Sequence, residues 1–447
     1  MAGQIRRRPF VATLLLAVSL GAAGCDSAEP TPTSTEPDAV VDRAAGPLPA
    51  PAAARAPGVI AELPAAPTLV DGRLRVMGLD DRVWAEPLAA SSGVAAFWSY
   101  RRKDADLVGY QVARNNAGRP LVVSYWDDGT LVGIDGSTGA PAWQGTGSRE
   151  GFAGNPGKAS FTGRSRHLIL ARGSRGDVAV VITTGRLTAV DAVTGAALWT
   201  WDKRSRCPDD DVFGMDTWES GGYLVLDAGC HKKKAALLVL DPRTGRTTAT
   251  LDPPLPWPAE NSKEAGVSAL GCTGHRSGCS IFGIMPTGST GGLRPLAWRI
   301  GAGGRADPVN AETIFVNGGR DGLYSVSEFE LIQVTPDGRY GWRVTGETHD
   351  LSRPQFRSAD PAGGLLWVSS YSWNGGPAAL VGLDPRTGRL RTCSAPPRGQ
   401  PIRFLRAEGE FLVVSDAREV VDVDADVLPP NAFQLLAPDT RPRGCPR

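Results

Sequence analysis

The chain has 447 residues, with 48 Lys and Arg against 47 Asp and Glu, and with 55 Gly and 36 Pro. The balanced charge excludes the strongly basic class of nucleic-acid-binding proteins, so we expect no nucleic-acid partner. The Gly and Pro content is typical of many short strands joined by tight turns, and 12 Trp against 7 Tyr indicate that Trp has a positional role.

The first 24 residues have the pattern of a lipoprotein signal peptide. Three arginines at 6–8 precede an apolar run at 10–20 that is too short to span a bilayer. The run ends in Ala-Ala-Gly-Cys at 22–25, which resembles a bacterial lipobox and predicts lipidation of Cys25. Cleavage that leaves Cys25 unmodified is the alternative, and Sec or twin-arginine export stays open. We therefore expect an exported protein, lipid-anchored to the outer face of the bacterial cytoplasmic membrane and attached to membrane only through that anchor.

Residues 25–67 are rich in Pro, Ala, Ser and Thr and have no apolar periodicity. Such a segment cannot bury enough surface to order itself, and it predicts a disordered tether. About 40 residues of this composition reach several tens of ångströms from the membrane. The folded part is then expected to occupy residues 68–447.

One turn motif recurs along the folded part, flanked by short β-rich runs such as 120–126, 177–183, 222–227 and 364–370. It reads Asp-x-x-Thr-Gly, with a Trp four residues past the glycine in its fullest copies. Asp can accept hydrogen bonds from backbone N–H groups in the turn, and Gly takes the positive φ that closes the hairpin. The motif residues are Asp135, Thr138, Gly139, Trp143, Asp191, Thr194, Gly195, Trp199, Asp241, Gly245, Gly338, Trp342, Asp384 and Gly388.

The spacing of the turn glycines sets the size of the repeat. Successive glycines lie 56, 50, 93 and 50 residues apart, and 93 is close to twice the others. The long gap predicts one degenerate copy, which we place at 279–285 and 296–298. Six repeats of about 50 residues then run from 94 to 393, and a repeated four-stranded unit of that length is a β-propeller blade.

Asp-x-x-Thr-Gly-x-x-x-Trp resembles the repeat of the pyrroloquinoline-quinone-like (PQQ-like) β-propellers. That family includes quinoprotein alcohol dehydrogenases and the propeller lipoprotein of the outer-membrane β-barrel assembly machinery. The resemblance implies an all-β propeller in which the turn docks a Trp between neighbouring blades. The Trp residues that it implies for this role are Trp143, Trp199, Trp298 and Trp342. Ala249 and Thr392 replace the Trp in two copies.

The remaining strands must close the ring. Runs at 401–405, 410–415 and 420–423 predict three strands, and 69–77 could supply a fourth, which would pair both ends of the chain in one blade. This arrangement gives seven four-stranded antiparallel blades. Eight blades are the alternative, because 69–110 is long enough to hold most of another one.

Six cysteines remain once Cys25 is assigned to the anchor. An even number in an exported chain predicts disulfides, and a metal site suggested by His275 is the rival. The order of the repeats favours Cys207 with Cys230, Cys272 with Cys279, and Cys393 with Cys445.

The sequence contains no P-loop, Gly-x-Ser-x-Gly or His-Glu-x-x-His pattern. It also lacks the adjacent cysteine pair common in quinoprotein dehydrogenases, so we expect no PQQ and no other cofactor. The acids at 422, 424 and 426 resemble the start of a calcium loop but are more simply a solvated strand edge. Trp126 and Trp373 lie at turns and are candidate aromatics of a binding face, with ordinary loop packing as the alternative.

These observations favour a non-catalytic, membrane-tethered, monomeric propeller that binds a protein or cell-envelope partner. The alternatives are an extracytoplasmic enzyme on a propeller scaffold, either a hydrolase or a quinoprotein, and a sensor of a small ligand. If the source has a single membrane, as the Ala-, Arg- and Gly-rich composition suggests, a role in outer-membrane assembly does not transfer with the fold.

Overall fold

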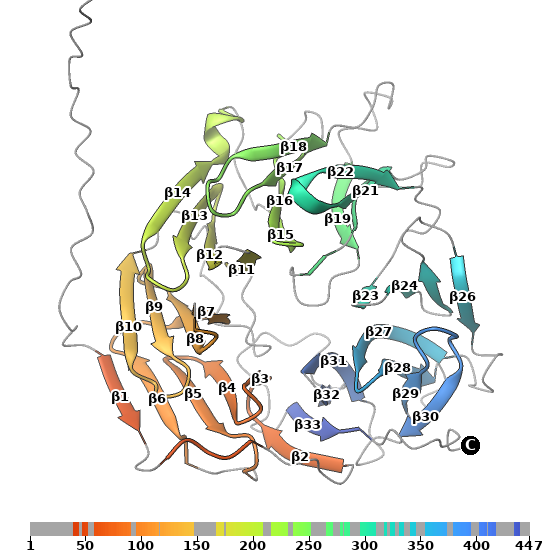
Figure 1. Cartoon of the computed structure of the whole chain (residues 1–447), viewed down its shortest axis with the longest axis horizontal. Coiled ribbons are helices and arrows are strands. Elements are labelled where there is room, and N and C mark those ends of the chain that lie inside the picture. Colours follow the sequence, from red (N-terminus) through yellow and green to blue (C-terminus); the bar gives the residue numbers. More distant parts are fainter. Residues whose placement is uncertain are drawn as a thin grey trace, which may run out of the picture.

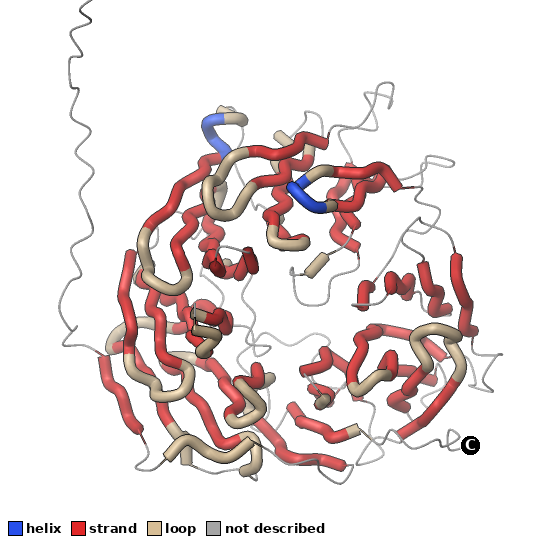
Figure 2. The backbone as a smooth tube through the Cα atoms, in the orientation of Figure 1, coloured by secondary structure: helices blue, strands red, loops and turns tan. Residues whose placement is uncertain are grey.

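The structure is a computed structural model, and its strands form a ring of small antiparallel sheets (Figure 1). The residues that it describes are 39–43, 47–51, 58–90, 95–115, 117–146, 167–173, 176–208, 216–230, 236–251, 265–270, 278–279, 281–286, 296–309, 317–319, 322–326, 330–334, 340–345, 354–372, 379–394, 402–408, 410–416 and 433–438. Within these ranges no helix is long and apolar enough to cross a membrane. Strands account for almost all of the regular structure, as Figure 2 shows.

Eight sheets are present among the described residues, and we number them in chain order. Sheet 1 contains β3 (Thr68–Val70), β4 (Leu74–Leu79), β5 (Arg82–Pro87) and β6 (Trp98–Arg102), with β1 (Ala39–Arg43) added beside β6. Sheet 2 contains β7 (Leu107–Arg114), β8 (Pro120–Trp126), β9 (Thr130–Asp135) and β10 (Pro141–Thr146). Sheet 3 contains β11 (Leu168–Gly173), β12 (Gly176–Thr183), β13 (Arg186–Asp191) and β14 (Ala197–Asp202).

The next four sheets follow the same up-and-down order. Sheet 4 contains β15 (Thr217–Ser220), β16 (Tyr223–Asp227), β17 (Leu237–Leu240) and β18 (Thr247–Leu251). Sheet 5 contains β19 (Ala265–Leu270), β20 (Ile281–Pro286), β21 (Leu296–Ile300) and β22 (Ala306–Val309). Sheet 6 contains β23 (Asn317–Gly319), β24 (Gly322–Val326), β25 (Glu330–Val334) and β26 (Tyr340–Thr345). Sheet 7 contains β27 (Pro354–Ala362), β28 (Leu365–Ser372), β29 (Ala379–Leu383) and β30 (Leu390–Ser394).

Sheet 8 closes the ring with strands from both ends of the chain. It contains β31 (Ile402–Glu408), β32 (Phe411–Asp416), β33 (Phe433–Ala437) and, as its outermost strand, β2 (Gly58–Leu63). β2 pairs antiparallel with β33, from Gly58 opposite Ala437 to Leu63 opposite Phe433. Two short 3-10 helices, η1 (Lys203–Ser205) and η3 (Ala302–Gly304), lie in connections between strands.

Successive sheets pack face to face, and the hydrophobic core lies between them. Sheets 2 and 3, for example, meet through Val123 and Tyr125 on one side and Ala179 and Val181 on the other. The intervening residue Val180 points the opposite way, into the cluster shared with sheet 4. Because a middle strand such as β12 is buried on both faces, its sequence is a nearly continuous apolar run. The outermost strand β10 is mostly exposed and carries polar residues.

The all-β propeller prediction is confirmed, but the preferred count of seven differs from the eight sheets among the described residues. Residues 68–102 build a complete sheet of their own, so 69–77 cannot serve as the closing strand. The closing strand is β2, which lies inside the segment expected to be a tether. Its apolar residues Ala61 and Leu63 are buried against Trp84 and Phe433. The folded part therefore begins before residue 68. The strand predicted at 420–423 lies outside the described residues.

A buried ion pair lies beside this closing junction. Arg75 on β4 is fully buried and contacts the Glu86 carboxylate on β5 at 2.6 Å. The indole N–H of Trp84 donates to the second Glu86 oxygen at 3.0 Å, and Arg75 also donates to the Ala90 carbonyl at 3.1 Å. The carboxylate is thus hydrogen-bonded through both oxygens, which a buried charge requires.

Candidate functional site

A tryptophan on the last strand, in chain order, of one four-stranded unit contacts the last turn of the next sheet. In each contact the indole N–H donates to the carbonyl oxygen of the residue directly after the turn Asp. The donor–acceptor pairs are Trp98–Gly136 at 3.0 Å, Trp143–Ala192 at 3.1 Å, Trp199–Pro242 at 2.7 Å and Trp342–Pro385 at 3.1 Å. Among the described residues the same bond therefore joins four pairs of sheets.

The turn glycine lies flat against the indole in all four contacts. Each glycine has a positive φ, between 66° and 75°, which residues with a Cβ rarely adopt. A Cβ atom at any of them would also overlap the ring. Its distance to the nearest carbon of the tryptophan side chain would be 2.6 Å at Gly139, 2.5 Å at Gly195, 2.7 Å at Gly245 and 2.6 Å at Gly388. Glycine is therefore required twice over, by backbone conformation and by the tryptophan.

The Asp and Thr of the motif shape the turn that receives the ring. Asp135 Oδ1 accepts hydrogen bonds from the backbone N–H groups of Ser137 and Thr138, both at 2.9 Å. Thr138 Oγ1 accepts from the N–H of Ala140 at 3.3 Å. The turns at 191–195, 241–245 and 384–388 repeat these bonds.

Neighbouring turns are also joined by charge at one position. Arg243, in the turn of sheet 4, contacts the Asp191 carboxylate in the turn of sheet 3 at 2.8 Å. Burial raises the pKa of the Asp191 carboxyl, but hydrogen bonds from Thr194, Arg243 and Val193 outweigh it and leave the pKa below its ordinary value. The charged form of Asp191 thus stabilises both its own turn and the junction.

The junctions on either side of sheet 5 depart from this scheme. Trp298, implied as a wedge, lies on β21, the third strand of sheet 5, because the last turn of that sheet is at 301–305 and not before Trp298. Ala249 stands at the Trp position of sheet 4, and its neighbour Thr248 donates a hydrogen bond to the Gly304 carbonyl at 3.3 Å. A small polar contact replaces the tryptophan there.

Trp98 makes the same contact but was missed, because no Asp-x-x-Thr-Gly turn precedes it. It lies 45 residues before Trp143, close to one repeat length. The turn at 135–139 also needs a ring from the preceding sheet. Counting one ring for each turn would have located it.

Of the two readings left open for Trp126, a binding-face aromatic or ordinary packing, the structure has it packed. It is fully buried between sheets 1 and 2, where its N–H donates to Ser124 Oγ at 3.0 Å and its ring lies 5.9 Å from that of Tyr100. As the last residue of β8, it points between sheets rather than out of the turn that follows. Trp373 lies outside the described residues.

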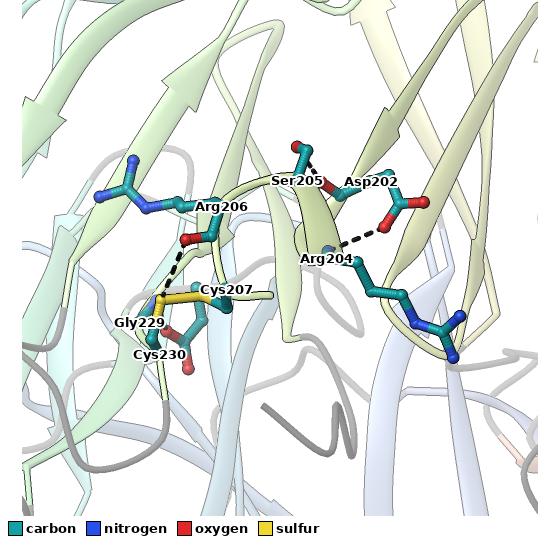
Figure 3. The surroundings of a disulfide bond; sticks show 8 residues. Asp202, Arg204, Ser205, Arg206, Cys207, Gly229 and Cys230 are labelled. Carbon is teal, nitrogen blue, oxygen red and sulfur yellow. Dashed lines mark hydrogen bonds between the residues drawn. A yellow bond between two sulfur atoms is a disulfide. The ribbon is translucent and has the colours of Figure 1, made fainter. Parts of the chain in front are cut away.

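A disulfide ties the connection after sheet 3 to sheet 4. Cys207, which follows η1, is bonded to Cys230, which follows β16, with their Cα atoms 5.6 Å apart (Figure 3). This is the pairing expected from the repeat order. Cys279 and Cys393 are also disulfide-bonded. Cys25, Cys272 and Cys445 lie outside the described residues.

A half-buried carboxyl, that of Asp227, and a buried lysine, Lys203, lie near this disulfide. Burial raises the pKa of the Asp227 carboxyl, although a hydrogen bond from the Gly229 N–H and the charge of Lys203 oppose the shift. The Lys203 side chain is itself buried, and its backbone is held by hydrogen bonds to Gly185 and Cys207.

Metal ligands are the remaining candidates from the sequence. Within the described ranges no three His, Cys, Asp or Glu residues come close enough together to hold an ion. The acids at 422, 424 and 426 and His275 all lie outside the part of the chain that the structure describes.

A protein-family model matches a little under half of the chain. Residues 47–250 match the family described as outer membrane protein assembly factor BamB. No curated protein matches the chain. BamB from Moraxella catarrhalis is similar at a TM-score of 0.47 with 16% identity, over 83% of this chain and 95% of that one. Quinohemoprotein alcohol dehydrogenase from Comamonas testosteroni gives a TM-score of 0.45 with 13% identity, over 88% of this chain and 76% of that one. The chain is thus an all-β propeller of four-stranded antiparallel sheets joined by a repeated Trp contact, and its residues 47–250 match a PQQ-like family model.

Proposed function

We propose that the protein is a non-catalytic propeller scaffold, tethered to the outer face of the cytoplasmic membrane, that binds a protein or cell-envelope partner without a cofactor. The observation that carries this proposal is the match of residues 47–250 to a family described as an assembly factor. The polar groups and rings of the motif residues are already engaged in the turns and in the contacts between sheets. Specificity for a partner therefore belongs to residues that do not repeat.

The location rests on two further features. The Ala-Ala-Gly-Cys sequence at 22–25 supports a lipid anchor, and the Cys207–Cys230 disulfide supports an oxidising compartment. Detergent phase partition of membranes tests the anchor. The unaltered protein is expected in the detergent phase, Cys25→Ser in the aqueous phase, and the control Ser27→Ala with the unaltered protein. Recovery of unaltered protein from the aqueous phase would contradict lipidation.

The scaffold role is tested by crosslinking in native membranes and identifying what is captured. A reproducible partner at near-stoichiometric yield is the expected result. Turnover by purified protein, or a tightly bound cofactor at one copy per chain, would instead support the enzyme. A small molecule that raises the melting temperature, with no captured macromolecule, would support the sensor.

A further inference from the structure

Sheet 1 has a strand more than the fold needs. β3 to β6 form a complete four-stranded sheet, and β1 adds outside β6, at the rim of the ring (Figure 1). The pairing is antiparallel and runs from Ala39 opposite Arg102 to Arg43 opposite Trp98. β1 comes from the segment that precedes the closing strand, so its covalent connection to the propeller runs through the chain that leads to β2.

The described side chains of β1, those of residues 40–42, contribute little to its attachment. Val40 is 53% exposed and Val41 is 40% exposed, which places both among the three exposed large hydrophobic residues of the described ranges. Asp42 is exposed as well. β1 is therefore held chiefly by main-chain hydrogen bonds to β6, and these bonds are available to any extended strand.

The ladder through sheet 1 shows which groups of β6 face outward. The Leu88 N–H donates to the Arg73 carbonyl at 2.8 Å, and these two residues continue the β4–β5 register, which has no bulge. The N–H of Leu88 therefore faces β4. By the alternation of an antiparallel ladder, the N–H groups of Val83 and Ala85 then face β6. They pair with Tyr100 and Trp98.

The N–H groups of Ser99 and Arg101 consequently face the opposite way, toward β1. Their partners across that ladder are Asp42 and Val40. The N–H of Val41 faces away from β6. Proline at 40 therefore removes a bond to β6, whereas proline at 41 removes none.

We propose that the outer edge of β6 is a strand-addition site for a protein partner, and that β1 occupies it in cis until the partner displaces it. The partner is an extended segment that pairs antiparallel with β6. Arg101 is exposed and lies opposite the uncharged Val40, so an acidic residue at that position gives a partner strand an advantage over β1. An edge strand without such a cover is prone to uncontrolled pairing, which gives β1 a protective role in the absence of the partner.

Hydrogen exchange on the purified full-length protein tests the cis contact. In Val40→Pro the exchange rates of the Ser99 and Arg101 amides are expected to rise at least tenfold. In the matched control Val41→Pro they are expected to stay within about twofold of the unaltered protein, because its missing N–H faces solvent. The Trp98 and Tyr100 amides, which face β5, should keep their protection in both variants and so report that sheet 1 is intact.

A synthetic peptide with the sequence of residues 38–44, Asp-Ala-Val-Val-Asp-Arg-Ala, then tests the opened edge. It is expected to bind Val40→Pro and restore the protection of Ser99 and Arg101, and to leave Val41→Pro unchanged. Replacing residues 39–43 by a Gly-Ser segment of equal length should behave as Val40→Pro does. Equal exchange in both proline variants, or no peptide binding to either opened form, would overturn the proposal. So would dimers of the unaltered protein that grow with concentration, because β1 would then be exchanged between copies.

The identity of the partner rests on the proposed scaffold role, but these measurements do not. They use purified protein and a defined peptide. Failure here removes the strand-addition site and leaves the scaffold proposal standing, whereas failure of membrane crosslinking alone leaves the edge of β6 intact as a site.

Discussion

Gly195 has no room for a side chain, because a Cβ atom there would lie 2.5 Å from the Trp143 ring. The sequence motif therefore records a contact between two sheets as well as a turn. Sequence alone gave the turn role, since Asp and Gly at fixed spacing have local chemistry. The role of each Trp at a junction came only from the family resemblance, because the turn that the Trp contacts lies about one repeat further along the chain.

Gly195→Ala should separate the two reasons for glycine. Gly118, in the turn between β7 and β8, has φ +74° against +73° for Gly195, but nothing lies within 4 Å of its Cβ position. We expect Gly118→Ala to lower the free energy of unfolding by about 1–2 kcal/mol, the cost of a positive φ. Gly195→Ala should lose about 1–3 kcal/mol more through overlap with Trp143. Equal losses in urea denaturation would show that the ring moves aside freely.

The charge on Asp191 makes a pH-dependent contribution to stability. Its pKa lies below the ordinary 3.8 in the folded state, so its contribution is present above that value and is lost as pH falls through the lower, folded-state pKa. Asp191→Asn removes the ion pair with Arg243 and should lower the free energy of unfolding at pH 7 by about 1–2 kcal/mol. The deficit should shrink below about pH 4, as unfolding measured at pH 7, 5 and 3.5 would show. A deficit independent of pH would contradict an ionic role, and Asp81→Asn, on the exposed β4–β5 turn, is the control.

At the scale of elements, strands were predicted correctly where they are middle strands of a repeat and are buried on both faces. The run at 120–126 corresponds to β8 and that at 177–183 to β12, since middle strands buried on both faces have continuous apolar sequences. β2 was missed for the opposite reason. Its apolar residues stand in a Pro- and Ala-rich segment, and their partners on β33 come from the far end of the chain. Nothing near β2 in sequence indicates that it is paired.

Leu63→Ala tests whether β2 belongs to the ring. Leu63 is 1% exposed in the cluster that joins sheets 8 and 1, and its truncation should lower the free energy of unfolding by about 2–5 kcal/mol. Val59, in the same strand, is 40% exposed, and Val59→Ala should change it by less than about 0.5 kcal/mol. Two small, equal effects in thermal or urea unfolding would place β2 in the tether after all.

At the scale of the whole molecule, the ring depends on junctions of different kinds. Sheets 8 and 1 are joined where the two ends of the chain meet, through β2 and a hydrophobic cluster. Sheets 3 and 4 share a cluster, the Trp199 contact and the Arg243–Asp191 pair, and the Cys207–Cys230 disulfide ties the connection between them. A covalent tie at this junction limits how far the two sheets separate when the ring opens elsewhere.

Removing that tie should destabilise the protein mainly through the unfolded state. The bond closes a loop with a sequence separation of 23 residues, for which loop entropy corresponds to about 3 kcal/mol. Cys207→Ala/Cys230→Ala should therefore unfold at lower temperature than the unaltered protein under non-reducing conditions. Reductant should lower the melting temperature of both, because Cys279 and Cys393 are also disulfide-bonded, but by less in the double variant. An unchanged melting temperature in the double variant would mean that the non-covalent contacts already hold sheets 3 and 4 together in the partly unfolded ring.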